Sequence, residues 1–91
     1  MKQEIKCIIT GRVQVVMFRD FTKRKAQTLN IVGTARNVDD GSIEVIAQGS
    51  KEELKEFVKH LEKGPPLANV AHVDVEWREP YDTFSSFNII Y

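Results

Sequence analysis

The sequence predicts a single α+β domain in which two helices pack on one face of a β-sheet. The chain has 91 residues, which leaves room for one hydrophobic core, so one domain is expected over residues 1–91. Two segments show the apolar spacing of amphipathic helices, and β-branched or alternating segments flank them. The predicted order is strand, helix, strand, strand, helix and strand, followed by a short fifth strand.

The first strand is predicted over residues 3–10, QEIKCIIT, which are rich in β-branched side chains. A loop separates this strand from a helix over residues 19–30, where Asn30 suits the left-handed position that ends a helix. The side chains expected to face the core recur at near-helical spacing and are Phe18, Phe21, Thr22, Ala26 and Leu29.

Two further strands are predicted over residues 32–38 and 42–48, joined by the tight-turn pair Asp40-Gly41. A second helix follows, with signals at both ends. Ser50 and Glu53 form the S-x-x-E pattern of a capping box, and Gly64 before two prolines ends the helix. Its predicted buried stripe consists of Leu54, Phe57, Val58 and Leu61.

The segment AHVDVEW, residues 71–77, alternates as a strand with one buried face, which predicts that Ala71, Val73, Val75 and Trp77 point inward. A last short strand is expected over residues 87–91. The complete order predicts an α+β, ferredoxin-like βαββαβ sandwich with an antiparallel sheet, two helices on one face and a short fifth strand. Many unrelated functions use this fold, so the fold alone names none.

Composition excludes several classes of function. Thirteen basic and thirteen acidic side chains give a net charge of zero, so neither nucleic acid nor an anionic membrane is an expected partner. RNA-recognition domains share the predicted topology, but the strand SIEVIAQ carries no aromatic residue for base stacking. Cys7 is the only cysteine and is expected to be a reduced core thiol. A cytoplasmic monomer without a membrane segment is therefore expected.

The loop GRVQVVMFRDF, residues 11–21, carries the features of an anion site. A turn between a strand and a helix directs backbone N–H groups at one point, where the helix dipole adds partial positive charge. Arg19 opens the helix beside that point, and its planar guanidinium matches two phosphate oxygens. These features predict a phosphate cradle, which is not a Walker motif because no G-x-x-x-x-G-K-[ST] occurs.

Two ordered motifs resemble the acylphosphatase signatures. GRVQVVMFR is similar to the first signature, G-x-V-Q-G-V-x-F-R, and departs from it only at Val15. GTARNVDDGSIEVIAQG is similar to the second, although Thr34 replaces an aromatic residue and Ile43 replaces valine. The segment GPPLANVAHVDVEW and the final F-x-I also resemble this family, so the resemblance covers nearly the whole chain.

The resemblance implies hydrolysis of small acyl phosphates to carboxylate and inorganic phosphate, without a metal or any other cofactor. By motif position, Arg19 is expected to bind the phosphate and stabilise its charge in the transition state, and Asn37 to orient the attacking water. Neither His60 nor His72 has the spacing of a metal ligand. Backbone amides are expected to complete the substrate site, from the residues Arg12, Val13, Gln14, Val15, Val16, Met17 and Phe18.

Val15 stands where the family has glycine. Glycine in such a loop serves either a positive φ or a close approach of the backbone to the ligand. If the loop demands a positive φ at this position, a β-branched residue costs about 1–3 kcal/mol or forces a rearrangement. If φ is negative, Val15 is tolerated and narrows only the mouth of the pocket. Impaired turnover is expected, and the alternative function is a non-catalytic module that binds phosphate or carbamoyl phosphate.

Overall fold

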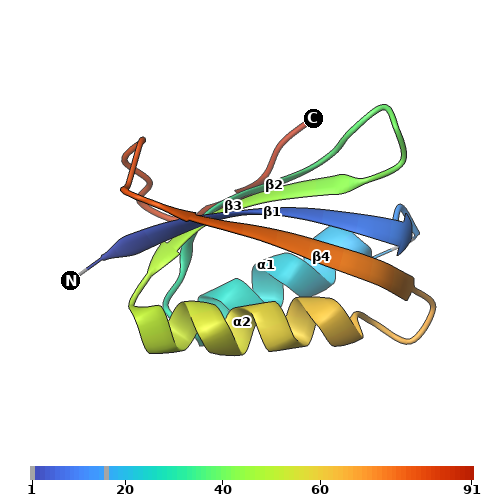
Figure 1. Ribbon diagram of the computed structural model, residues 1–91, viewed down its shortest axis with the longest axis horizontal. Coiled ribbons are helices and arrows are strands. Elements are labelled where there is room, and N and C mark those ends of the chain that lie inside the picture. The colour runs from blue at the N-terminus through green and yellow to red at the C-terminus, as the bar shows by residue number, and fades with distance from the viewer. Residues whose placement is uncertain (1, 16) are drawn as a thin grey trace.

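The computed structural model describes residues 2–15 and 17–91 as two layers, a five-stranded sheet and a pair of helices (Figure 1). The order of elements is the predicted one. Their bounds are β1 Gln3–Arg12, α1 Phe18–Thr28, β2 Val32–Asn37, β3 Ile43–Gly49, α2 Lys51–Lys63, β4 Asn69–Arg78 and β5 Phe87–Ile89. The ferredoxin-like α+β class is confirmed.

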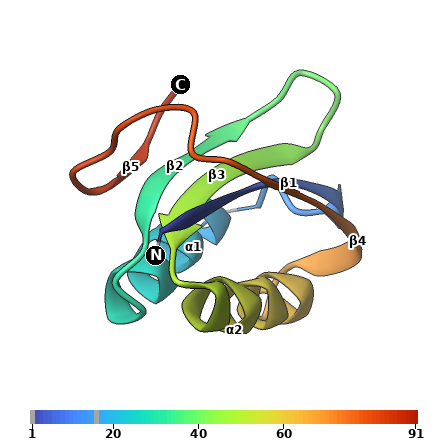
Figure 2. The ribbon, with the colours of Figure 1, turned by 60° about the vertical axis from the view of Figure 1, so that its left-hand side comes forward.

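The strands lie in the order β4-β1-β3-β2-β5, and both helices cover the same face of the sheet (Figures 1 and 2). The pairs among the first four strands are antiparallel, as predicted. β5 instead pairs with β2 in parallel, so the complete sheet is mixed. The direction of β5 follows from the path of the chain. β4 and β2 run in opposite directions, so the C-terminal end of β4 lies at the same end of the sheet as the N-terminal end of β2, and β5 starts from there.

The hydrophobic core lies between the sheet and the helices. The capping box of α2 is formed, since Glu53 N–H donates to the Ser50 hydroxyl and Ser50 N–H donates to the Glu53 carboxylate, both over 3.2 Å. Asn30 has a φ of 58° directly after the end of α1, as predicted. The helices bury the side chains of Phe18, Thr22, Ala26, Leu54, Phe57 and Leu61. No helix in the described part of the chain is long and apolar enough to cross a bilayer.

Cys7 lies in this core with no exposed surface, as predicted. Burial, and secondarily the negative charge of Asp74, raises the pKa of its thiol to about 12. The thiol therefore stays protonated at neutral pH, which excludes Cys7 as a nucleophile in the folded protein.

The predicted alternation of residues 71–77 is only half correct. The register between β1 and β4 passes from Thr10–His72 to Gly11–Val70, so Ala71 is the extra residue of a bulge and is exposed. Val70 packs against the core in its place. Trp77, expected in the core, is 43% exposed, because β4 forms the edge of the sheet and α2 covers only one flank of that side chain.

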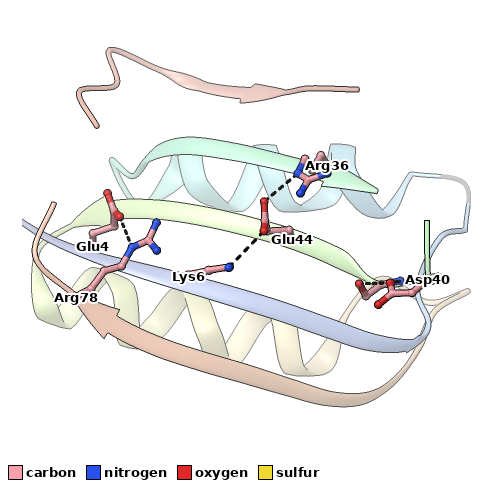
Figure 3. A network of polar contacts seen from close by, with 7 residues as sticks. Glu4, Lys6, Arg36, Asp40, Glu44 and Arg78 are labelled. Carbon is pink, nitrogen blue, oxygen red and sulfur yellow. Dashed lines mark hydrogen bonds and ion pairs between the residues drawn. The ribbon is translucent and has the colours of Figure 1, made fainter. Parts of the chain in front are cut away.

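A buried carboxylate fastens the connection between β4 and β5 to the sheet. Glu4 has no exposed surface and accepts hydrogen bonds from Gln48 and from the Tyr81 N–H. It also accepts a hydrogen bond from Arg78 (Figure 3). Gln48 also donates to the carbonyl oxygen of Asp82 over 2.6 Å. Burial raises the pKa of Glu4, but hydrogen bonds from Gln48, Tyr81 and Arg78 outweigh burial, so its pKa lies below the usual value.

Glu4→Gln is expected to destabilise the fold at neutral pH by about 2–4 kcal/mol, because Arg78 loses its charged partner. Since the pKa of Glu4 is lowered in the folded state, its contribution is present above the unfolded pKa and is lost as pH falls through the folded value. Urea unfolding of both proteins across a pH series measures this, with Glu52→Gln on the exposed start of α2 as control. A difference in stability that does not shrink toward acid pH would contradict the assignment.

Candidate active site

The loop between β1 and α1 leaves the sheet through a bulge. The shift in register falls between Thr10 and Gly11, and Gly11 has a φ of 119°, which favours glycine. A Cβ at Gly11 would lie 2.4 Å from the carbonyl oxygen of Asn69, so a side chain does not fit there. The first glycine of the motif is therefore needed to lead the chain from β1 into the loop.

The loop ends in a tight turn that starts α1 one residue earlier than predicted, at Phe18. Phe18 N–H donates to the carbonyl oxygen of Val15 over 3.2 Å, and Met17 has φ 75° and ψ 4°, a left-handed conformation. Among the described non-glycine residues, only Met17 and Asn30 have a positive φ. Among the described residues of this loop, the strained non-glycine position is thus Met17, whereas Val15 is half-buried against the core without a positive φ.

Gln14 ties this loop to the turn between β2 and β3. Its side-chain amide donates to the carbonyl oxygens of Val38 and Ser42, over 2.7 and 2.8 Å. This turn directly follows Asn37, the last residue of β2. Hydrogen bonds from the Ser42 hydroxyl and N–H order the turn and hold the pKa of Asp40 below its usual value (Figure 3). The amide of Gln14 therefore holds the loop before α1 and the end of β2 at a common site.

A cavity of about 390 Å³ lies where these two segments meet. Arg19 reaches it from the first turn of α1, and Asn37 reaches it from the end of β2. The guanidinium carbon of Arg19 lies 4.9 Å from the centre of the Tyr91 ring, a cation–π arrangement with a ring that is 98% exposed. Six predicted residues line the cavity, namely Gln14, Val15, Met17, Phe18, Arg19 and Asn37.

Two other predicted residues, Arg12 and Val13, are described by the structure and do not line this cavity. Arg12 belongs to β1, pairs with Asn69 of β4 and is exposed. Val13 is 1% exposed and its side chain packs in the core. Val16 lies outside the described residues. The expected contribution of these three backbone amides to substrate binding stays a prediction.

Arg19 at the start of α1 and Asn37 at the end of β2 line the same cavity. The two sequence motifs predict this arrangement for the family. The family model for acylphosphatases matches residues 5–89 of the chain. The chain belongs to the acylphosphatase family. Its enzyme class is that of the acyl phosphate hydrolases, as predicted.

Relatives and solved structures agree with this membership. The curated acylphosphatase of Dehalococcoides mccartyi is 43% identical over 88 residues, which are 96% of this chain and 97% of that protein. The acylphosphatase of Bacillus licheniformis is 42% identical over 88 residues, which cover 97% and 98% of the two chains. The crystal structure of the acylphosphatase from Bacillus subtilis aligns with a TM-score of 0.94 at 32% identity, over 100% of both chains.

Sequence reasoning missed three residues at this acylphosphatase cavity: Asp20, Ile89 and Tyr91. Asp20 follows Arg19 directly, so its proximity could have been inferred from the chain. Ile89 and Tyr91 come to the cavity because β5 pairs with β2, and the chain continues from there past Arg19. The sequence predicts only a short strand over residues 87–91, with no signal for the strand beside which it lies.

Proposed function

We propose that this chain hydrolyses the carboxyl–phosphate bond of small acyl phosphates to carboxylate and inorganic phosphate, without a metal. The observation that carries the proposal is the convergence of Arg19 and Asn37 on one cavity beside the N-terminus of α1. A helix N-terminus presents free N–H groups and partial positive charge to an anion. Arg19 adds a full positive charge at the same end of the helix.

Arg19 binds the phosphoryl group in this proposal. Its fork of N–H donors engages two phosphate oxygens, and its charge offsets the negative charge that the equatorial oxygens carry in the transition state. Arg19 is otherwise unfavourably placed, because the dipole at the start of a helix repels a cation.

Asn37 positions the attacking water. Its amide donates and accepts hydrogen bonds but does not titrate near neutral pH, so it orients the water without deprotonating it. The water oxygen bonds to phosphorus while the bond from phosphorus to the acyl oxygen breaks. The electron pair leaves with the carboxylate, and a phosphate oxygen of the substrate accepts the proton. A carboxylate is a good leaving group, so positioning and charge stabilisation suffice.

Hydrolysis of acetyl phosphate in the presence of a metal chelator, with phosphate titration on the same sample, tests this function. We expect chelator-resistant turnover and competitive inhibition by phosphate. Binding of phosphate without hydrolysis would instead support the non-catalytic phosphate or carbamoyl phosphate module. A monomeric state and a cytoplasmic location are further predictions for the same protein.

Val15→Gly is expected to raise kcat for acetyl phosphate while it lowers stability by about 1–2 kcal/mol. The Val15 side chain packs against the core and narrows the cavity that it lines, so its removal frees space for the ligand and for a relaxed turn at Met17. Steady-state kinetics and urea unfolding measure the two effects. Val13→Ala is the control, since it trims a buried valine away from the cavity. An unchanged or lower kcat for Val15→Gly would refute this interpretation of the loop.

A further inference from the structure

The cavity holds a second charge that hydrolysis does not require. Asp20 lines it beside Arg19, and its side chain is 49% exposed. Among the described residues that line the cavity, Arg19 is the only cation and Asp20 the only acid. We propose that Asp20 is a specificity-determining residue, which selects acyl phosphates with a neutral acyl group and disfavours those whose acyl group is itself anionic. This inference rests on the proposed function of the same site.

Charge assigns the two ends of the substrate to different parts of the cavity. The phosphoryl group is drawn to Arg19 and to the start of α1, and a carboxylate repels it. Asp20 therefore faces the part of the ligand that is not phosphate, which in an acyl phosphate is the acyl group. The other described lining residues include the exposed Met17 and Tyr91 and the half-buried Ile89. An uncharged or apolar acyl group suits such walls.

The neighbouring Arg24 holds the Asp20 carboxylate in place without cancelling its field. Arg24 Nε lies 3.2 Å from Asp20 Oδ2, one helical turn away, and both side chains are about half exposed. Exposed pairs of this kind are weak in water, so a ligand in the cavity still meets negative potential from Asp20. Arg24 does not line the cavity, so the cation that pairs with Asp20 lies outside it.

Stabilisation of the helix is the other role open to an acid in the first turn of α1, because the dipole favours it there. The two roles predict changes in different kinetic quantities. A helix-stabilising role changes the amount of folded enzyme and hence the rate for every substrate alike. A selecting role changes the ratio of kcat/KM between two substrates that differ only in the charge of the acyl group.

The test compares acetyl phosphate, which has a neutral acyl group, with succinyl phosphate, whose acyl group carries a carboxylate. Asp20→Asn is expected to raise kcat/KM for succinyl phosphate by about three- to ten-fold more than it raises kcat/KM for acetyl phosphate. Arg24→Gln is expected to lower kcat/KM for succinyl phosphate, since the negative charge of Asp20 then lacks this neighbouring cation. Glu52→Gln is the matched control, because it removes an acid from the first turn of α2.

Screening supplies a second readout. In about 0.5 M salt the wild-type ratio of kcat/KM for acetyl phosphate to kcat/KM for succinyl phosphate should fall toward the ratio measured for Asp20→Asn. The ratio for Asp20→Asn should itself change little with salt. Equal effects of Asp20→Asn on the two substrates, or no effect on either, would overturn the inference.

Binding separates this inference from the proposed function. Acetonylphosphonate and 4-oxo-5-phosphonopentanoate are non-hydrolysable methylene analogues of the two substrates, and calorimetric titration gives their affinities without turnover. Selection by Asp20 is supported if the wild-type protein binds acetonylphosphonate more tightly than 4-oxo-5-phosphonopentanoate and if Asp20→Asn removes this difference in affinity. This result would stand even if acetyl phosphate is not hydrolysed and the catalytic proposal fails. Equal affinity of the wild-type protein for both analogues rejects selection by Asp20, whether or not hydrolysis occurs.

Discussion

Arg19→Gln is expected to lower kcat/KM for acetyl phosphate by at least about 10³-fold, the range in which arginines that stabilise phosphoryl transfer contribute. The variant loses both the paired donors and the positive charge at the cavity beside α1. Phosphate affinity should fall as well, because the same group binds the ground-state anion. Initial rates and phosphate inhibition constants measure the two losses.

Stability distinguishes this loss from unfolding. Arg19 lies in the first turn of α1, where the helix dipole disfavours a cation, so Arg19→Gln should keep or slightly raise the Tm. Arg19→Lys should recover only part of the activity, since lysine keeps the charge but lacks the planar fork. Lys23→Gln, which removes a cation from α1 outside the cavity, serves as the charge control. Arg19→Gln with near-normal turnover would exclude Arg19 from the catalytic site.

Asn37→Ala is expected to lower kcat by about 10²–10³-fold while phosphate inhibition changes less than about three-fold. The different pattern follows from the different role, because Asn37 orients the water and Arg19 carries the phosphate. Asn37 is exposed at the end of β2, so the substitution should leave the Tm nearly unchanged.

Asn88→Ala on the adjacent strand β5 is the control for Asn37→Ala, since Asn88 is exposed and its side chain donates to Ser86. Asn37→Asp adds a second comparison. An aspartate accepts hydrogen bonds but donates none when ionised, and its charge repels the phosphate, so both kcat and phosphate affinity should fall. Equal losses of phosphate affinity and kcat in Asn37→Ala would reassign Asn37 from the water to the phosphate.

Much of the candidate site could be predicted from sequence because the two motifs place Arg19 and Asn37 at positions set by local structure. Arg19 lies in the first turn of a helix, and Asn37 ends a strand before a tight turn. What the motifs do not contain is the contact that brings the two segments together. Gln14 provides it through two carbonyl oxygens more than twenty residues away along the chain.

The position of loop strain also escaped prediction. Glycine at position 15 in the family suggests a positive φ at Val15, yet among the described residues of the loop the non-glycine residue with a positive φ is Met17. A turn distributes its dihedral angles over several residues, so a substitution at one position is accommodated at another.

The sequence by itself determined the elements whose signals are local. The capping box of Ser50 and Glu53, the left-handed Asn30 and the buried stripe of α2 each depend on hydrogen bonds or spacing within a few residues. Only the tertiary structure decided the parallel pairing of β5, the exposure of Trp77, and the meeting of Tyr91 with Arg19 at one cavity. These features depend on pairing between segments far apart in the chain, and the packing of the whole sheet selects that pairing.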